Sequence, residues 1–512
     1  MLAHTKINVF NPQEKNVSLQ LKWRNSWRNE VNFDGVYIFL KYKPKSREGY
    51  ETMKIVSVSP APFQGKDAMP DGFDKLGENI KTGIYVPDTK IGFFVFPEEA
   101  CYKQKIEIKE IKVPVEVDEV EAIEVFAIEM VYIPEGSFKI GDIRGSVKMG
   151  GKAINGFYTY PNKPTYQILS NDKIEFGPEE GMLYCDMDNP FSRSGAERFT
   201  IPEHYPKGYQ AMWYMKHPLT MSQWVKFLNC LTRKQQQAQV HADLSGDEVT
   251  NYYVMTNTDH VEDRNEIFCK QYGNGISESV KFYTSMPHTI CNVLDWFSLC
   301  SFACFAGLRP ITELEYIKAC RGPLEPVANE FAWGSAHIGR VWNFDVDEAE
   351  RIDRPIPERP GCLANANYDA HTEMLQGKPK PFKGTAPDWG GSVSESTFEN
   401  APLVEGYSER ECMGASYYGV LELSGNLWEY LISIGNEKGR AFDGSHGSGY
   451  LTSEGLYHMP SWPNPMTGEG FSQRGGNYVS DVPPKFFIDS RPFGTFSKKS
   501  GIAYHGGIRV GF

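Results

Sequence analysis

Hydrophobic and polar residues alternate along several short segments in the first part of the chain, which is the pattern of half-buried strands. The segments are residues 17–23, 35–43, 91–96 and 105–117. The third is a continuous apolar run, and Pro114 restricts the fourth to an edge or a break. Glycine, proline and asparagine separate the segments, so the pattern predicts an all-β sandwich domain over residues 1–120.

A different pattern begins near residue 126 and predicts a second domain over residues 126–512. Residues 128–142 read as strand, turn and strand. The acidic segment 116–125 connects the two parts, and we expect few contacts across it. A fragment that starts near Ala122 is therefore expected to fold alone.

Helical periodicity with start and stop signals appears only in the second part. Trp224, Phe227, Leu228 and Leu231 have the i, i+3, i+4, i+7 spacing of one helix face. The predicted helices are residues 220–231, 293–307 and 312–322. Thr220 with Gln223 and Thr312 with Glu315 form capping boxes, and Gly307 and Gly322 end the later helices.

Two long polar stretches, residues 143–210 and 233–285, show little periodicity and are predicted to be insertions. The rest of the second domain consists of turns and short strands. The sequence thus predicts an α+β fold with few helices and much loop behind the β-sandwich.

Composition narrows the classes of function. The chain has 512 residues and a net charge of −12, so it repels phosphate backbones and no nucleic-acid partner is expected. It contains no run of 18 apolar residues, so membrane insertion is not expected. The first residues lack the pattern of a signal peptide. The ten cysteines include no CxxC pair, which favours reduced core thiols over a zinc site.

Seven segments of the second part occur in the order of a known family. They read MVYIPEGSFKIGD, MKHPLTMSQWVKFLN, CNVLDWFSLCSFACFAGLRPITELEYIKACRG, FAWG, YYGVLELSGNLWEY, QRGGNY and GGIRVGF. Together they resemble the formylglycine-generating enzyme, or sulfatase-modifying factor, family. The resemblance implies a C-type-lectin-like fold for residues 126–512.

The reaction centres of that family are not matched by this sequence. Its enzymes use a copper-binding cysteine pair, and the matching positions are Ser480 and Lys485. Neither is a soft thiolate ligand for copper(I). A related branch uses iron held by a histidine-rich helical domain, but no HxxxH or HxH cluster is present here. We therefore expect no copper, no iron and a nonenzymatic protein.

Calcium is the metal that the resemblance does support. The segment ELSGNLWEY resembles the family's calcium loop, and oxygen ligands suit this hard cation. The matching positions are Glu422, Gly425, Leu427 and Glu429, the middle two through backbone carbonyls. A second, weaker match places another site at Asn367, Tyr368 and Glu395. The alternative is that these polar side chains bond the loop backbone.

Aromatic and basic residues crowd the C-terminal segment, where lectin-like folds often build their ligand face. The candidate ligand-binding residues are Trp462, Tyr478, Ser480, Lys485, Phe487, Arg491, Phe493 and His505. Some of these rings belong to the core, and isolated histidines more often bond loops.

The leading hypothesis is a recognition or adhesion protein at a cell or virion surface that binds a protein or a glycan through this face. One alternative is an oxidoreductase of the same family with an unrecognised metal centre. Another is a structural subunit of a phage tail, or of a secretion or motility apparatus.

Overall fold

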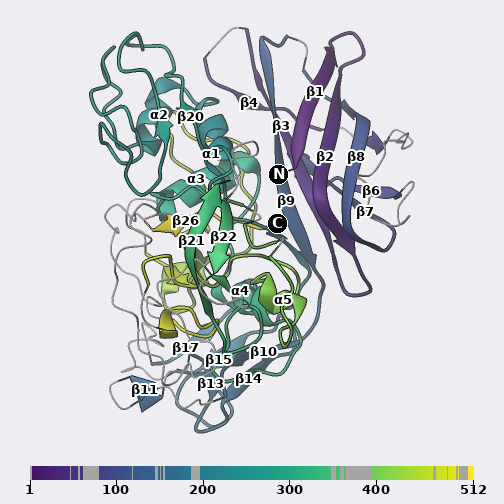
Figure 1. Ribbon diagram of the computed structural model, residues 1–512, viewed down its shortest axis with the longest axis vertical. Helices are drawn as coiled ribbons and strands as arrows, with labels where there is room; N and C mark the ends of the chain where they lie inside the picture. Colours follow the sequence, from purple (N-terminus) through teal and green to yellow (C-terminus); the bar gives the residue numbers. More distant parts are fainter. Residues whose placement is uncertain are drawn as a thin grey trace.

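Most of the regular structure is β-strand, and the helices are few and short (Figure 1). The computed structural model describes residues 3–45, 48–55, 58–60, 80–117, 119–143, 148–149, 152–153, 156–185, 197–346, 353–357, 363–364, 394–395, 397–399, 401–464, 467, 469–480, 483–491, 494 and 505–512. Within these ranges no helix has the length and apolar character needed to cross a membrane.

The N-terminal part is built on one ten-stranded sheet. Its strands are β1 (His4–Asn11), β2 (Asn16–Arg28), β3 (Phe33–Lys43), β4 (Glu51–Thr52), β5 (Ser59–Pro60), β6 (Thr82–Tyr85), β7 (Gly92–Pro97), β8 (Cys101–Pro114), β9 (Ala122–Ile133) and β18 (Met212–Met215). The sheet folds over, so that β1, β2 and β8 face β3, β7 and β9 across a shared apolar core (Figure 1). The predicted β-sandwich character is confirmed, and Pro114 is the last residue of its strand.

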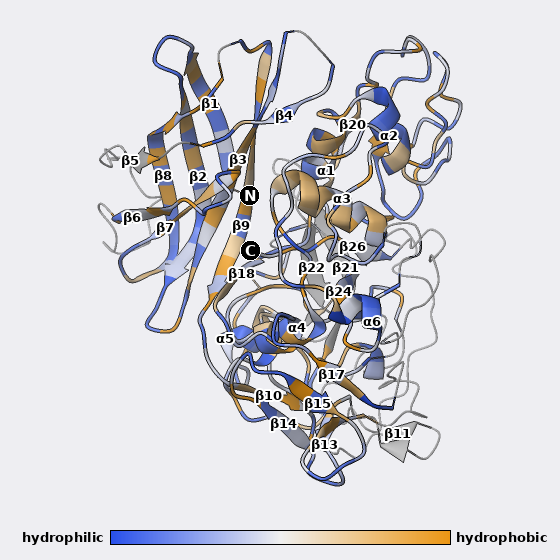
Figure 2. Cartoon of the chain, turned by 180° about the vertical axis from the view of Figure 1, so that it is seen from behind, coloured by the Kyte–Doolittle hydropathy of each residue, from blue (hydrophilic) through white to orange (hydrophobic). Residues whose placement is uncertain are grey.

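Strand β3 shows why its hydrophobic pattern is not a strict alternation. Val36, Ile38 and Leu40 point into the core between the two layers. Tyr37 and Phe39 point the other way, into the large core of the C-terminal part. Both faces of β3 are buried, so apolar residues occupy nearly every position. Figure 2 shows the contrast with β2 and β8, whose blue and orange bands alternate.

The sheet continues across the predicted boundary between the two parts. β9 is hydrogen-bonded to β3 along its full length, from the Phe33–Tyr132 pair to the Lys43–Ala122 pair. β18 pairs with the other edge of β9, and the C-terminal residues 510–512 bond β18 in turn. The division at residues 120–126 therefore lies within a hydrogen-bonded sheet, and a fragment experiment tests the independent folding that the sequence predicts.

The three predicted helices are present. They are α1 (Met221–Leu228), α3 (Trp296–Ala306) and α4 (Glu313–Arg321). Thr220 and Thr312 form their capping boxes, and Gly307 ends α3 in a left-handed conformation with φ 70°. α3 begins later than the pattern predicts, because the Asp295 carboxylate caps it by accepting the Ser298 amide at 2.8 Å. The short helices are α2 (Arg233–Gln239), α5 (Glu409–Cys412), α6 (Glu437–Arg440) and the 3₁₀ turn η1 (Pro483–Lys485).

The predicted insertions carry their own small sheets. In the first, β10 (Phe138–Gly141) pairs with β14 (Thr165–Ile168), and a four-stranded sheet contains β13 (Tyr158–Thr159), β15 (Ile174–Phe176), β16 (Leu183–Tyr184) and β17 (Phe199–Ile201). In the second, β19 (Ile267–Phe268) pairs with β20 (Tyr283–Thr284). Figure 1 shows α2 and β20 at the end of the molecule beyond α1 and α3.

The remaining strands are β11 (Lys148–Met149), β12 (Lys152–Ala153), β21 (Gly339–Val346), β22 (Asp353–Pro357), β23 (Leu363–Ala364), β24 (Trp428–Ile432), β25 (Phe471–Arg474) and β26 (Gly506–Gly507). β24 lies between β25 and β26 in a three-stranded sheet, which contains parts of the last three of the seven segments quoted above. The nine cysteines of the described residues form no disulfide, and eight of them are buried.

Candidate functional site

The glycine pair after β25 brings three segments close together. Gly475 and Gly476 have φ values of 84° and 71°. A Cβ at Gly475 would lie 2.5 Å from the Leu423 carbonyl oxygen, and one at Gly476 would lie 2.5 Å from the Phe486 ring. Only glycine combines this conformation with this proximity. The pair therefore packs the C-terminal segment against the loop before β24.

Ser480 and Lys485, the two positions that match the copper ligands, lie in different surroundings. The buried Ser480 hydroxyl donates to the Asn477 side-chain oxygen at 2.5 Å and accepts from the Asn477 amide at 3.2 Å. Lys485 lies in η1 and is partly exposed. Burial raises the pKa of the Cys291 and Cys300 thiols, which disfavours the thiolate that copper(I) needs. The donor chemistry of the described residues does not fit a copper centre of the family's kind.

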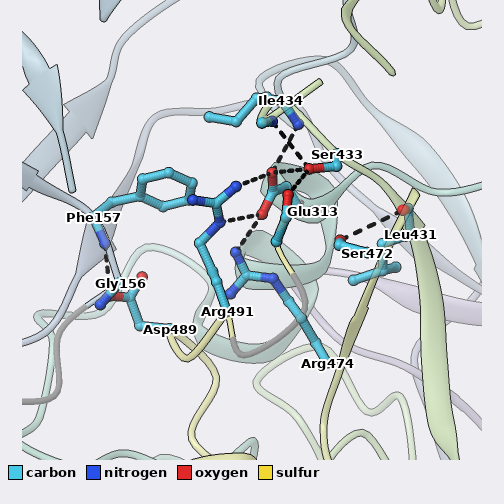
Figure 3. A network of polar contacts seen from close by, with 12 residues as sticks. Gly156, Phe157, Glu313, Leu431, Ser433, Ile434, Ser472, Arg474, Asp489 and Arg491 are labelled. Carbon is cyan, nitrogen blue, oxygen red and sulfur yellow. Dashed lines mark hydrogen bonds and ion pairs between the residues drawn. The ribbon is translucent and has the colours of Figure 1, made fainter. Parts of the chain in front are cut away.

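Arg491, a predicted ligand-binding residue, lies in a buried ionic network (Figure 3). Its Nε and one terminal nitrogen lie 2.6 and 2.9 Å from the two carboxylate oxygens of Glu313, at the start of α4. Arg474 of β25 donates to the same carboxylate at 2.7 Å. Although burial opposes it, the two arginines lower the pKa of Glu313 to about 2. The network joins α4 to the C-terminal segment and leaves Arg491 fully buried.

Other candidates on the C-terminal segment are also inside the protein. Trp462 is buried, and its indole N–H donates to the Ser445 carbonyl at 3.0 Å. Phe487 packs against Phe331 in a small apolar cluster. The predicted residues Phe493, Asn367 and Tyr368 lie outside the described residues.

The predicted calcium loop is bent and buried, but its carboxylates already have partners. Glu422 accepts from the Asn426 side chain at 2.7 Å, and burial raises the pKa of Glu422 to about 8. Glu429 forms a buried ion pair of 2.9 Å with Arg509. Within the described residues, no group of three or more His, Cys, Asp and Glu side chains is arranged to hold a metal. In the observed geometry these carboxylates have protein partners, which does not fit the predicted ligand set, and a melting experiment with calcium tests the prediction from the resemblance.

Glu395, predicted for the second calcium site, is paired with a histidine. Its carboxylate lies 2.7 Å from Nδ1 of His288, and the Glu395 amide donates to the His288 carbonyl at 2.9 Å. His288 is partly exposed, whereas Glu395 is buried. The pair fixes the imidazole at the edge of the 233–285 insertion.

Tyr478 and His505 are brought together, and the insertion adds a third polar residue to them. Nδ1 of His505 lies 2.8 Å from the Tyr478 hydroxyl, and that hydroxyl donates to the Asp263 carboxylate at 3.2 Å. Tyr478 is buried, whereas Asp263 and His505 are partly exposed. We call Asp263, Tyr478 and His505 the polar triad.

The protonation states of the polar triad follow from burial. Burial raises the pKa of Tyr478 and lowers the pKa of His505, so both are neutral near pH 7. Because the single hydroxyl proton of Tyr478 goes to Asp263, Nδ1 of His505 carries a proton and donates to the hydroxyl oxygen. Nε2 of His505 is then an acceptor. The hydrogen bonds within the triad thus have a defined direction, and two of its three residues are partly exposed.

Strained backbone holds the Asp263 carboxylate in place. Asp263 and Arg264 have φ values of 49° and 57°, and the β-branched Val293 has φ 58°. Two buried asparagines support them. The Asn292 side chain donates to the Asp263 carbonyl at 2.7 Å, and the Asn265 side chain donates to the Asn292 carbonyl at 3.1 Å. Such strain persists where the surroundings over-determine it, and it is frequent at binding sites.

Sequence reasoning identified Tyr478 and His505 but missed Asp263 and its two asparagines. Asp263 lies 215 residues before Tyr478, in a polar stretch without period. No local signal distinguishes it from the neighbouring Asp259 or Glu262. Only the fold brings the insertion to the C-terminal segment.

Comparison with known proteins does not assign a family. No family model matches the chain, and no curated protein matches it. Among solved structures, the chain is similar to domains D2 and D3 of the major pilin SpaD from Corynebacterium diphtheriae. The match has 11% identity and a TM-score of 0.14, and it covers 39% of this chain and 70% of that chain. A likeness of this level supports no argument about function.

Proposed function

We propose that the protein is a nonenzymatic recognition protein with a C-type-lectin-like scaffold of the formylglycine-generating-enzyme kind. Its ligand is a protein or a glycan at a cell or virion surface. The binding surface lies where the 233–285 insertion meets the C-terminal segment. Most of the C-terminal residues first considered for binding are buried, so the insertion supplies much of this surface.

The polar triad is the observation that supports binding at this place. Asp263 and His505 reach the surface from two segments far apart in the chain, and strained backbone fixes Asp263. Tyr478 sets the direction of their hydrogen bonds. A fixed set of donors and acceptors recognises a polar ligand with little loss of side-chain entropy. This argument favours recognition over a passive structural subunit.

The rival function is oxidation of a cysteine peptide by a metal centre. Ser480 and Lys485 argue against it, because a hydroxyl and an ammonium cannot hold copper(I). The protein is incubated with a sulfatase-type cysteine peptide, copper and oxygen, and the aldehyde product is measured by mass spectrometry. We expect no conversion above a control without protein. Catalytic conversion would overturn the proposed function.

Binding is tested on arrays of immobilised glycans and polypeptides. Wild-type protein is compared with His505→Gln, and His4→Gln on β1 is the matched control because His4 is exposed and distant from the triad in the chain. We expect a specific ligand whose binding is weakened by the first change and unaffected by the second. Failure to bind any member of either array would contradict recognition.

A further inference from the structure

An exposed row of aromatic rings crosses the 233–285 insertion. Tyr253 is bridged to Phe268, and Phe268 is the cross-strand partner of Tyr283. The ring centroids of Tyr253 and Phe268 are 6.1 Å apart, and those of Phe268 and Tyr283 are 6.0 Å apart. Tyr252 adds a further ring, 4.9 Å from Tyr253. We call Tyr253, Phe268 and Tyr283 the aromatic row.

The aromatic row lies on the outer face of a small layer that is formed by β19, β20 and the extended segment at Tyr253. The residues next to it in the chain are buried, namely Val254, Ile267, Cys269 and Phe282. Because side chains of extended chains alternate between two faces, the row points away from the core. Tyr283 keeps 40% of its surface exposed, and Tyr253 and Phe268 are partly exposed. Exposed aromatic clusters of this kind are typical of binding surfaces.

Charged residues differ on the two sides of the aromatic row. Lys270 follows Phe268 by two positions and Lys281 precedes Tyr283 by two, with the buried Cys269 and Phe282 between them, so alternation places both exposed lysines on the face of the row. On the other side, the Ser285 hydroxyl donates to the Glu266 carboxylate. Within the described part of the chain neither lysine forms a salt bridge, so their positive charge faces solvent.

We propose that the aromatic row binds an acidic glycan, a ligand that carries carboxylate or sulfate groups on sugar rings. The inference rests on the proposed function and names its ligand class. Sugar rings present apolar C–H faces that pack on tyrosine and phenylalanine rings. Lys270 and Lys281 attract the anionic group, and the Glu266 carboxylate accepts hydrogen bonds from sugar hydroxyls.

Charge and shape favour an acidic glycan over two other anionic ligands, nucleic acid and an acidic polypeptide. A protein of net charge −12 repels a uniformly charged phosphate backbone. Lys270 and Lys281 make one side of this face locally positive. A sugar chain with few charges can place an anionic group there without strong repulsion from the rest of the protein. An acidic polypeptide has the charge but lacks the flat apolar faces that match the row, and it is the alternative that the test must exclude.

The test measures binding of the full chain to hyaluronan, which carries a carboxylate on every second sugar ring, with uncharged dextran as the control polymer. We expect hyaluronan to bind, dextran not to bind, and salt to weaken the complex. Tyr283→Ala should weaken binding at least about tenfold, as for a central aromatic contact. The double change Lys270→Glu and Lys281→Glu should abolish it. Tyr450→Ala and Lys6→Glu are matched controls at exposed positions elsewhere, and they should bind as wild type.

Three results would overturn the inference. They are no binding of hyaluronan, equal binding of dextran, or unchanged binding by Tyr283→Ala with an unchanged melting temperature. If the polypeptide array alone retains the protein, the glycan inference fails while recognition stands. If neither array retains it, the proposed function itself fails.

Discussion

Glu313 holds a buried negative charge that two arginines neutralise, and this arrangement gives Arg491 a structural role. All three side chains are inaccessible to solvent. Ile434 and Ser433 also donate to the carboxylate, at 2.8 and 3.3 Å. Removing one partner of such a network leaves an uncompensated charge in a medium of low polarity.

We therefore expect Arg491→Met to lower the free energy of unfolding by about 3–5 kcal/mol. Denaturant unfolding followed by tryptophan fluorescence measures the change. Arg198→Met is the matched control, because Arg198 pairs with Glu179 in an exposed position and such pairs contribute about 0–1 kcal/mol. Equal, small effects of the two changes would show that the buried network is not a major source of stability.

A second buried ionic group surrounds Lys216, beside the end of β18. Its ammonium lies 2.6 Å from Glu399, 3.5 Å from Glu129 and 3.8 Å from Asp34. Although Lys216 opposes it, burial raises the pKa of Asp34 to about 7 and also raises the pKa of Glu129. The group contains three carboxylates and one ammonium, so protons on Asp34 and Glu129 reduce its net charge.

The sign of the pH dependence follows from the raised pKa of Asp34. Between the unfolded value of 3.8 and about 7, the folded chain holds a proton that the unfolded chain has released. This contribution to stability is complete below pH 3.8 and is lost as the pH rises to about 7. Because burial lowers the pKa of His217 to about 3 and so acts in the opposite direction within this window, the prediction concerns a difference between variants.

We expect the stability of wild type relative to Asp34→Asn to fall as the pH rises through this window. A difference of one unit between the folded and unfolded pKa values changes the free energy of unfolding by about 1.4 kcal/mol. Urea unfolding at a series of pH values measures the difference in stability, and Asp88→Asn at an exposed position is the control. A constant difference between wild type and Asp34→Asn would contradict the raised pKa.

The calcium loop permits a direct test by melting. The resemblance predicts that calcium raises the melting temperature, because an ion bound only by the folded chain stabilises it. The Glu429–Arg509 pair leads us to expect the same melting curve in chelator and in excess calcium. A rise with calcium that Glu422→Gln abolishes would instead establish the site.

At the scale of elements, α4 depends on its first turn. The Thr312 hydroxyl accepts the Glu315 amide at 3.1 Å and donates to the Pro206 carbonyl at 2.8 Å. The Glu315 carboxylate accepts the Thr312 amide at 2.9 Å and bonds Arg309. One capping residue thus joins the helix to a loop that precedes it by about a hundred residues.

Thr312→Ala should lower the free energy of unfolding by about 1–2 kcal/mol, since both hydroxyl bonds are lost. Thr312→Ser keeps the hydroxyl and should retain most of the stability. Thermal unfolding of the three proteins measures the effect. If the serine variant is as unstable as the alanine variant, the methyl group and not the cap accounts for the loss.

At the scale of the whole molecule, the ten-stranded sheet is part of the support for the C-terminal core. The Tyr37 hydroxyl donates to the Ala306 carbonyl at 2.9 Å, and the buried Lys41 ammonium donates to the Phe305 and Gly449 carbonyls at 2.6 Å. These hydrogen bonds attach β3 to the last turn of α3 and to the loop at Gly449. Without β3, the edge of β9 and the aromatic residues facing α3 would be exposed.

We therefore expect a fragment that starts at Ala122 to fail to fold by itself, contrary to the expectation from sequence. Near-UV circular dichroism should show no fixed tertiary structure, and unfolding should not be cooperative. Adding residues 1–121 as a separate chain tests whether the fragment fails to fold because β9 lacks its pairing with β3. A soluble fragment with a cooperative transition would show that the second part is an independent domain.

Elements with local signals were predictable from the amino-acid pattern alone. Alternation identified β2 and β8, and capping boxes identified α1 and α4, because each signal arises from residues within one or two turns or within one strand. The helix start at Asp295 was missed because Val293 and Leu294 extend the apolar pattern past the cap. The contact between the buried Tyr478 and the partly exposed His505 could not be inferred from their spacing in the sequence.

The partners of the polar residues, in contrast, became known from the folded chain. Arg491 meets Glu313 across 178 residues, and Tyr478 meets Asp263 across 215 residues. The local sequence shows whether a side chain is apolar. It does not show which charged residue, far away in the chain, forms an ion pair with a buried charge. The same limit applies to β3, whose two apolar faces join both parts of the chain in one sheet. Long-range pairing is set by the packing of whole layers, so it appears only when the chain is folded.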